Sequence, residues 1–230
     1  MTELEKTLAH KADKTLTSRK KFFLWIEFLL LFLLVPYYYA FHHESSPLLF
    51  LCVLALFGIV FLYKNESFRN EFFLNKQGWF EDLPRILMVF ALMSVILGLF
   101  TYLFYPDCLF YCPRNHFPVW VSLMVIYPLL SVYPQELIYR AFLFHRYSPL
   151  LQKDRNVIHL SAGAFAFGHI IYFHPLSIIL TFLGGYLFAW TYARTRSLLA
   201  VSFEHALYGC LLYTIGLGRF FYTGFDKLIN

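Results

Sequence analysis

Residues 22–41 read FFLWIEFLLLFLLVPYYYAF, an apolar run that contains one charged side chain, Glu27. A membrane-spanning helix needs about 20 mostly apolar residues, because the hydrocarbon core offers the backbone no hydrogen-bond partner. This run is long enough to cross the membrane. No small-x-small cleavage site follows it, so the pattern predicts a retained helix and not a cleaved signal peptide.

The composition of the rest of the chain agrees with a membrane protein. Of 230 residues, 59% are hydrophobic, 21% aromatic and only 14% charged, and the mean hydropathy is +0.57. Soluble proteins carry roughly 25% charged residues, so an ordinary cytosolic domain is excluded. Disordered, collagen-like and disulfide-dense secreted chains are excluded as well, because Pro, Gly and Cys are too few.

Seven apolar segments predict an all-α, polytopic transmembrane bundle of about seven spans. We find no internal repeat and no low-complexity linker. We therefore expect a basic tail at residues 1–21, followed by a single integral membrane domain at 22–230. The seven segments are 22–41, 47–63, 86–105, 117–145, 157–173, 176–193 and 198–217.

The basic residues predict the orientation of these spans. The net charge is +5, but Lys and Arg fall between the apolar runs, which is not a nucleic-acid signature, so no nucleic-acid partner is expected. Fifteen of the 19 basic residues fall on one side and three on the other, with Arg140 inside a span. Cytoplasmic loops are enriched in Lys and Arg, which predicts a cytoplasmic N-terminus and an external C-terminus.

The connections between the spans carry two further patterns. Residues 64–85 mix aromatic and charged side chains, which is typical of a helix lying in the membrane interface. Cys108 and Cys112 lie in the external connection, where an oxidising compartment would allow a small disulfide loop. A metal site built from these two cysteines and His116 is a weaker alternative. Cys52 and Cys210 are expected to be ordinary core residues.

Placing an ionisable residue inside a bilayer costs on the order of 2.5–3.5 kcal/mol of insertion free energy, so the presence of each such residue in a span has to be explained. Glu27 and His159 lie near cytoplasmic ends and can extend toward water. The remaining polar residues in the spans gather in the second half of the chain: Gln135, Glu136, Arg140, His169, Glu204 and His205.

Three of these residues fall at a similar depth. At 1.5 Å per helical residue, Glu136, His169 and His205 lie roughly 15, 18 and 12 Å from the cytoplasmic ends of their spans. Small residues around His169 favour close helix packing, so its side chain is expected to face the interior. A carboxylate and two imidazoles in one pocket could perform acid–base hydrolysis or bind a metal.

Other kinds of intramembrane site are not supported. No Asp falls inside an expected span, which argues against a paired-aspartate protease, and neither H-E-x-x-H nor G-x-S-x-G occurs. The histidine boxes of membrane di-iron oxidases are absent. A transporter would need polar groups along a whole path, whereas these gather at one depth.

The remaining pattern resembles the CAAX-protease and bacteriocin-processing (CPBP, or Abi) family, which includes the type II CAAX prenyl endopeptidases. Its motifs are E-E-x-x-x-R, F-x-x-x-H and H-x-x-x-N or a small residue. They correspond here to Gln135-Glu136…Arg140, Phe165…His169 and His205…Gly209, within a core at about 117–221.

The resemblance implies an intramembrane endopeptidase of the glutamate type. In that family a Glu and the middle His activate a water, and the later His and its partner stabilise the oxyanion. No cofactor is expected. The family has also been described as metalloproteases, however, and zinc held by Glu136, His169 and His205 would be chemically reasonable.

Two departures from the family pattern leave two hypotheses. Gln135 replaces the first Glu, the usual base, and Gly209 offers no side-chain donor. In the first hypothesis Glu136 is the base, Gln135 positions water or substrate, His169 and His205 complete the site, and Arg140 orients the carboxylate. In the second, the chain is a catalytically silent relative that binds a membrane partner.

The expected partners are the lipid bilayer and a membrane-embedded or lipidated peptide or protein substrate. The sequence carries no recognisable targeting extension, which favours the bacterial plasma (inner) membrane.

Overall fold

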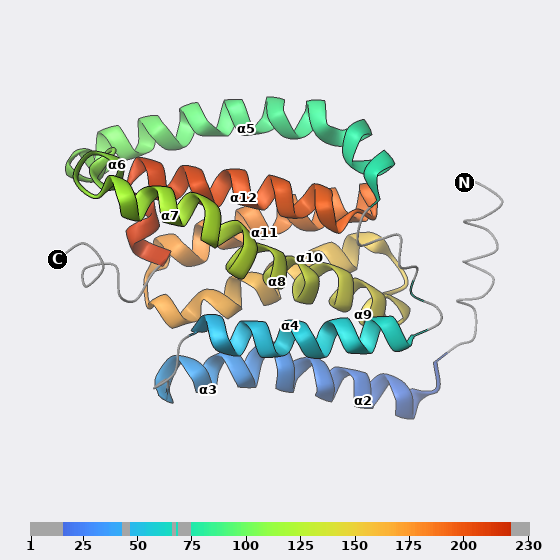
Figure 1. Ribbon diagram of the computed structural model, residues 1–230. Coiled ribbons are helices and arrows are strands. Elements are labelled where there is room, and N and C mark those ends of the chain that lie inside the picture. Colours follow the sequence, from blue (N-terminus) through green and yellow to red (C-terminus); the bar gives the residue numbers. More distant parts are fainter. Residues whose placement is uncertain (1–15, 43–46, 66–67, 69–74, 222–230) are drawn as a thin grey trace.

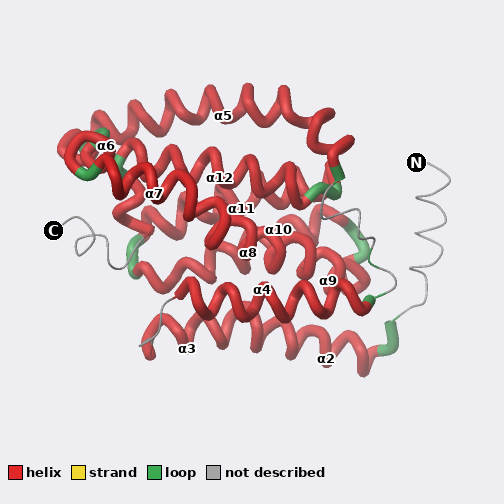
Figure 2. The backbone as a smooth tube through the Cα atoms, in the orientation of Figure 1, coloured by secondary structure: helices red, strands yellow, loops and turns green. Residues whose placement is uncertain are grey.

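The computed structural model describes residues 16–42, 47–65, 68 and 75–221, and every regular element in these ranges is helical (Figures 1 and 2). Most of the expected basic tail, residues 1–15, lies outside them. The helical elements confirm the expected all-α bundle. The α-helices are α2 (Ser18–Leu29), α3 (Val35–His42), α4 (Pro47–Lys64), α5 (Lys76–Phe104), α6 (Tyr111–Asn115), α7 (Phe117–Tyr127), α8 (Tyr133–Glu136), α9 (Leu143–Leu151), α10 (Asp154–Gly168), α11 (Pro175–Thr195) and α12 (Leu198–Ile215).

Six short turns of other helical types join or extend these helices in the described part of the chain. Those at 30–34, 128–132 and 137–142 are π-helical, and each sits inside a longer rod. The remaining turns are 3₁₀. These turns are η1 (Leu30–Leu34), η3 (Pro106–Cys108), η4 (Pro128–Val132), η5 (Leu137–Phe142), η6 (His169–Tyr172) and η7 (Leu217–Phe221).

Five rods in the described part of the chain are long and apolar enough to cross a membrane: Ser18–His42, Lys76–Phe104, Phe117–Leu151, Pro175–Thr195 and Leu198–Ile215. The other two expected spans also form helices, α4 and α10, but these are shorter or less apolar. The seven expected segments are therefore all helical, and five of them meet the length and apolarity of a span.

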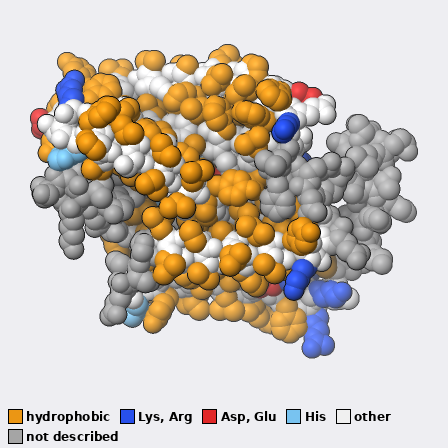
Figure 3. Space-filling view, in the orientation of Figure 1, with side chains coloured by type: hydrophobic (Ala, Val, Ile, Leu, Met, Phe, Trp, Pro, Cys, Tyr) orange, Lys and Arg blue, Asp and Glu red, His pale blue; other side chains and the backbone are white. Residues whose placement is uncertain are grey.

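The outer surface of the bundle suits lipid. Figure 3 shows apolar side chains covering most of the described face. On α5, Met88, Leu92, Val95 and Leu103 are each more than half exposed. A soluble protein would not leave so large an apolar area in water, so these side chains are placed to contact hydrocarbon.

The connection before α5 differs from expectation. The interfacial helix expected at residues 64–85 is not a separate element, because residues 76–85 form the first turns of α5 and residues 66–67 and 69–74 lie outside the described ranges. Asp82 therefore lies inside a candidate span, which corrects the expectation that no Asp does. Its buried carboxylate is neutralised by Arg85 at 2.6 Å and Arg194 at 3.0 Å, which makes this depth tolerable.

Prolines shape the rod that carries the first motif. Pro128 and Pro134 lack a backbone N–H, so a regular helix cannot continue its hydrogen bonds past them. The π turn η4 begins at Pro128, and α8, which begins at Tyr133, contains Pro134. A second π turn, η5, follows Glu136 directly. Such wide turns are frequent at functional sites because they redirect the side chains beside them.

The structure also shows the surroundings of Glu27, His159 and two of the cysteines. Glu27 does not simply extend to water: it receives two hydrogen bonds from Arg146, at 2.8 and 2.6 Å, and one from the Tyr147 hydroxyl, at 3.0 Å. His159 is exposed, near the ring of Tyr186. Cys108 and Cys112 are buried free thiols.

Candidate active site

Glu136 and His205 come together although 69 residues separate them in the sequence. The His205 Nδ1 lies 2.7 Å from the Glu136 Oε1, and both side chains are buried. A carboxylate only accepts hydrogen bonds, so Nδ1 carries the proton and donates it to Glu136. This contact joins α8 to α12 and orients the imidazole in the manner of a carboxylate–histidine pair.

The other imidazole nitrogen meets a residue that the sequence did not single out. The Tyr127 hydroxyl lies 3.2 Å from the His205 Nε2. Glu136, His205 and Tyr127 thus form one connected chain of polar groups. Among 17 tyrosines nothing in the local sequence distinguishes Tyr127, because its role depends on how α7 packs against α12.

Gly209 makes this arrangement possible. A Cβ at position 209 would collide with the Tyr127 ring, which lies against the glycine. Gly209 is also one turn beyond His205 on α12, on the same helical face. The tyrosine hydroxyl therefore occupies the space beside His205 that a side chain at position 209 would otherwise fill.

Arg140 neutralises the buried carboxylate. Its Nε lies 3.0 Å from the Glu136 Oε2, neither side chain is exposed, and its Nη2 donates to the Gly185 carbonyl at 3.3 Å. Glu136 is engaged by Arg140 and His205, and it is not among the residues that line the central cavity. Breaking such a buried pair by removing one partner costs about 3–5 kcal/mol.

Two phenylalanines hold Arg140 and His205 in place. The guanidinium carbon of Arg140 lies 4.6 Å from the Phe165 ring centre and 5.7 Å from that of Phe188. The same rings contact His205, Phe188 stacked at 4.6 Å and Phe165 edge-on at 5.5 Å. Phe165 belongs to the second motif, whereas Phe188, on α11, was not predicted from the sequence.

His169 also contacts the Phe165 ring. Its ring centre is 4.6 Å from that of Phe165, and its Nδ1 lies 2.7 Å from the Phe165 carbonyl oxygen. A carbonyl accepts, so Nδ1 is the protonated nitrogen and Nε2 keeps its lone pair. His169 and His205 thus pack against the same ring.

A large apolar cavity of about 780 Å³ lies within the bundle beside these residues. Gln135, His169, His205 and Gly209 line it, together with Tyr127 and many apolar side chains. The Gln135 Nε2 donates to the Ser131 hydroxyl at 2.8 Å, and its buried Oε1 has no hydrogen-bond partner among the described residues. That oxygen is free to accept a hydrogen bond from a water or substrate.

Zinc does not fit this arrangement of side chains. Within the described ranges, no group of three His, Cys, Asp or Glu residues is placed to hold a metal ion, neither around Glu136 nor around Cys108, Cys112 and His116. Around Glu136, the carboxylate and both nitrogens of His205 already have protein partners.

Residues 116–211 match the family model described as type II CAAX prenyl endopeptidase, Rce1-like. This match supports the resemblance to the CAAX-protease family that the three motifs indicate. No curated protein and no solved structure is significantly similar to the chain. The matched segment contains Gln135, Glu136, Arg140, His169, His205 and Gly209.

Proposed function

We propose that the protein is an intramembrane endopeptidase that hydrolyses peptide bonds of membrane-embedded or lipidated substrates. The chain of contacts from Glu136 through His205 to Tyr127, opening on a cavity that His169 also lines, is the observation that carries this proposal. The apolar walls of the cavity suit a lipid-soluble substrate, and its few polar groups suit the orientation of one scissile bond.

In this proposal His169 and Gln135 activate the water. The His169 Nε2 holds the lone pair that takes the proton of the attacking water, and the free Gln135 Oε1 accepts the second O–H of that water. The imidazole then returns the proton to the leaving amine. A positioned general base of this kind contributes about 10²–10⁴-fold to the rate.

Glu136, His205 and Tyr127 form the opposite, oxyanion-stabilising side. The sequence suggested Glu136 as the base, but its position off the cavity favours an action through His205. Glu136 fixes the His205 ring, and His205 in turn holds the Tyr127 hydroxyl beside the cavity, where this hydroxyl can donate to the carbonyl oxygen as negative charge develops there. The tyrosine thereby supplies the donor that Gly209 cannot.

A cleavage assay on the reconstituted protein with a library of membrane peptides tests this function. The parent protein is expected to cleave at least one peptide, whereas Glu136→Gln and His169→Ala abolish cleavage while the protein still folds. Because the proposed steps use no metal, a chelator is expected to leave the rate unchanged. If the chelator abolished cleavage and added zinc restored it, the mechanism would be contradicted.

The second candidate is a catalytically silent member that binds a membrane partner. Gln135 favours it, because an amide lines the cavity where the family pattern has a carboxylate. In this case the parent cleaves no peptide, and Gln135→Glu creates the activity. Cleavage by the parent would exclude this candidate.

A further inference from the structure

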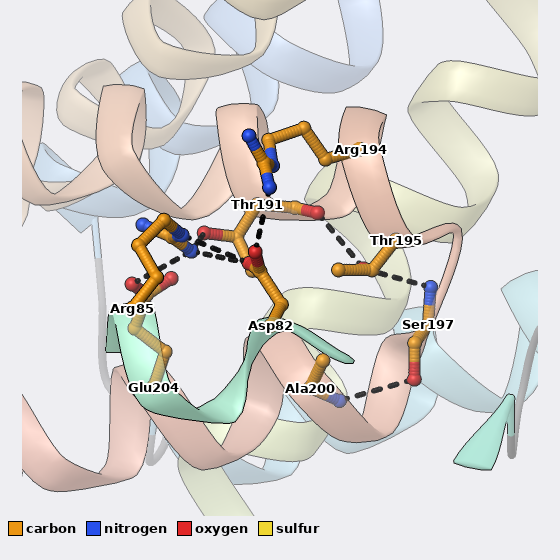
Figure 4. Close-up of polar contacts among 8 residues, drawn as sticks. All are labelled: Asp82, Arg85, Thr191, Arg194, Thr195, Ser197, Ala200 and Glu204. Atoms are coloured by element: carbon orange, nitrogen blue, oxygen red, sulfur yellow. Dashed lines mark hydrogen bonds and ion pairs between the residues drawn. The ribbon is translucent and has the colours of Figure 1, made fainter. Parts of the chain in front are cut away.

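A second group of charged side chains lies in the membrane domain, apart from the candidate active site (Figure 4). Arg85 on α5 contacts Asp82 at 2.6 Å, the Thr191 hydroxyl of α11 at 2.6 Å and Glu204 of α12 at 3.5 Å. Asp82 also receives a hydrogen bond from Arg194 at 3.0 Å. The proposed reaction uses none of these groups, although each is costly to place at this depth.

The outer end of this network is open to solvent. Arg194 is 52% exposed, whereas Asp82 is 3% exposed and Glu204 is fully buried. A small polar pocket of about 390 Å³ lies at this end, and Asn75, Glu81, Asp82 and Arg194 line it. The charged groups therefore run from a polar pocket beside exposed Arg194 into the bundle.

The inner end reaches the central cavity. Tyr208 follows Glu204 by one turn of α12, so the two side chains share a helical face. Tyr208 borders the same cavity as His169 and His205. The series Asp82, Arg85, Glu204 and Tyr208 therefore connects the polar pocket to the space where hydrolysis is proposed.

Three buried polar atoms along this series have no hydrogen-bond partner among the described residues: the Arg85 Nη1, the Glu204 Oε2 and the Tyr208 hydroxyl. A network that only neutralised its own charges would satisfy these atoms internally. Buried polar groups that protein atoms leave unpaired are ordinarily satisfied by ordered water, which makes about three hydrogen bonds.

We infer that the Asp82–Arg85–Glu204–Tyr208 series is a water route from the polar pocket to the catalytic cavity. The inference rests on the proposed function, because each peptide bond cleaved consumes one water and the apolar cavity walls cannot supply it. The protein then has two separate entrances: the apolar cavity admits the substrate, and the charged series admits water.

Hydroxyl-radical footprinting of the protein in phosphatidylcholine nanodiscs tests this route without a substrate. Radicals formed from bound water oxidise adjacent side chains, so Tyr208 is expected to be oxidised at least threefold faster than Tyr139. Tyr139 is likewise a partly buried tyrosine that borders the same cavity, but it lies outside the charged series. Oxidation of Tyr208 no faster than that of Tyr139 would overturn the inference.

Variants then locate the source of the water. Glu204→Leu is expected to lower Tyr208 oxidation at least threefold, whereas Glu204→Gln preserves it. Thr101→Val is the matched control, since the buried Thr101 hydroxyl bonds only within α5. If Glu204→Leu does not fold, the double variant Arg85→Met/Glu204→Leu removes both charges of this pair together, and Asp82 keeps Arg194 as its partner. An unchanged Tyr208 rate in the folded variant would show that water enters elsewhere.

The two proposals can fail separately. A parent protein that cleaves no peptide but has a hydrated Tyr208 would contradict the endopeptidase and support the water route. A parent that cleaves peptides while Tyr208 stays dry would contradict the water route alone.

Discussion

Tyr127 and Gly209 act as a pair of residues. The glycine carries no donor, but its missing side chain leaves room for the Tyr127 ring, whose hydroxyl then reaches the His205 Nε2 at 3.2 Å. The two positions are 82 residues apart in the chain. A departure from the family pattern at one position is thus accommodated by a residue from another helix.

Tyr127→Phe removes the hydroxyl and keeps the ring. If this hydroxyl stabilises the oxyanion, kcat is expected to fall about 10²-fold, with a much smaller change in KM. Steady-state kinetics on a cleaved peptide measure this. Tyr102→Phe on the exposed face of α5 is the control, and an unaltered kcat for Tyr127→Phe would remove the tyrosine from the mechanism.

Gly209→Ala leaves the tyrosine in the chain but displaces its ring. We expect cleavage to fall at least tenfold, because the new methyl group collides with Tyr127. Gly163→Ala on α10 is the matched control: nothing lies within 4 Å of its added Cβ, and Ala stabilises a helix by about 0.5–1 kcal/mol over Gly. Equal activity in both variants would refute the steric explanation.

At the scale of elements, α2 is attached to the motif-bearing rod by a polar clamp. Glu27 accepts two hydrogen bonds from Arg146 and one from Tyr147, both on α9. The Tyr147 ring also meets the Phe28 ring edge-on, with centres 5.4 Å apart. The first rod has no catalytic motif, but it closes one side of the cavity, which Phe32 and Tyr39 line.

Glu27→Ala should therefore loosen this rod. Hydrogen bonds to charged groups contribute about 1.5–3 kcal/mol, and partial exposure of Glu27 places the expected loss near the lower value, about 2 kcal/mol. Thermal unfolding in detergent is expected to show a Tm several degrees lower. Glu81→Ala is the control, since the Glu81 carboxylate is bonded within α5 to Gln77. Equal Tm values would show that the clamp adds no stability.

At the scale of the whole molecule, the two ends of the bundle differ in charge. Arg194, Arg196 and Lys153 lie at the end where α2, α5 and α12 begin, and Arg114 lies at the other end, in α6 (Figure 1). The basic end is predicted to face the cytoplasm. The proposed water route would then begin on the cytoplasmic side.

Cysteine labelling tests this orientation. In a chain without its native cysteines, a membrane-impermeant maleimide applied to intact cells should label Arg114→Cys and leave Lys153→Cys unlabelled, and both positions are exposed. Inside-out vesicles should reverse the result. Native Cys112 is a poor reporter because burial raises the pKa of its thiol. The opposite labelling pattern would invert the predicted topology.

The sequence by itself determined the helical membrane architecture and the residues of the three motifs, because span length and apolarity are local sums that each segment carries independently of its neighbours. It also predicted that Glu136 and His205 share a similar depth, but depth does not determine which way a helix is turned. Only the tertiary structure decided that Glu136 lies off the cavity, that Tyr127 fills the space beside Gly209, and that Asp82 enters a span. These depend on how the π turns and close packing rotate each helix, and contacts between distant parts of a chain leave no local pattern.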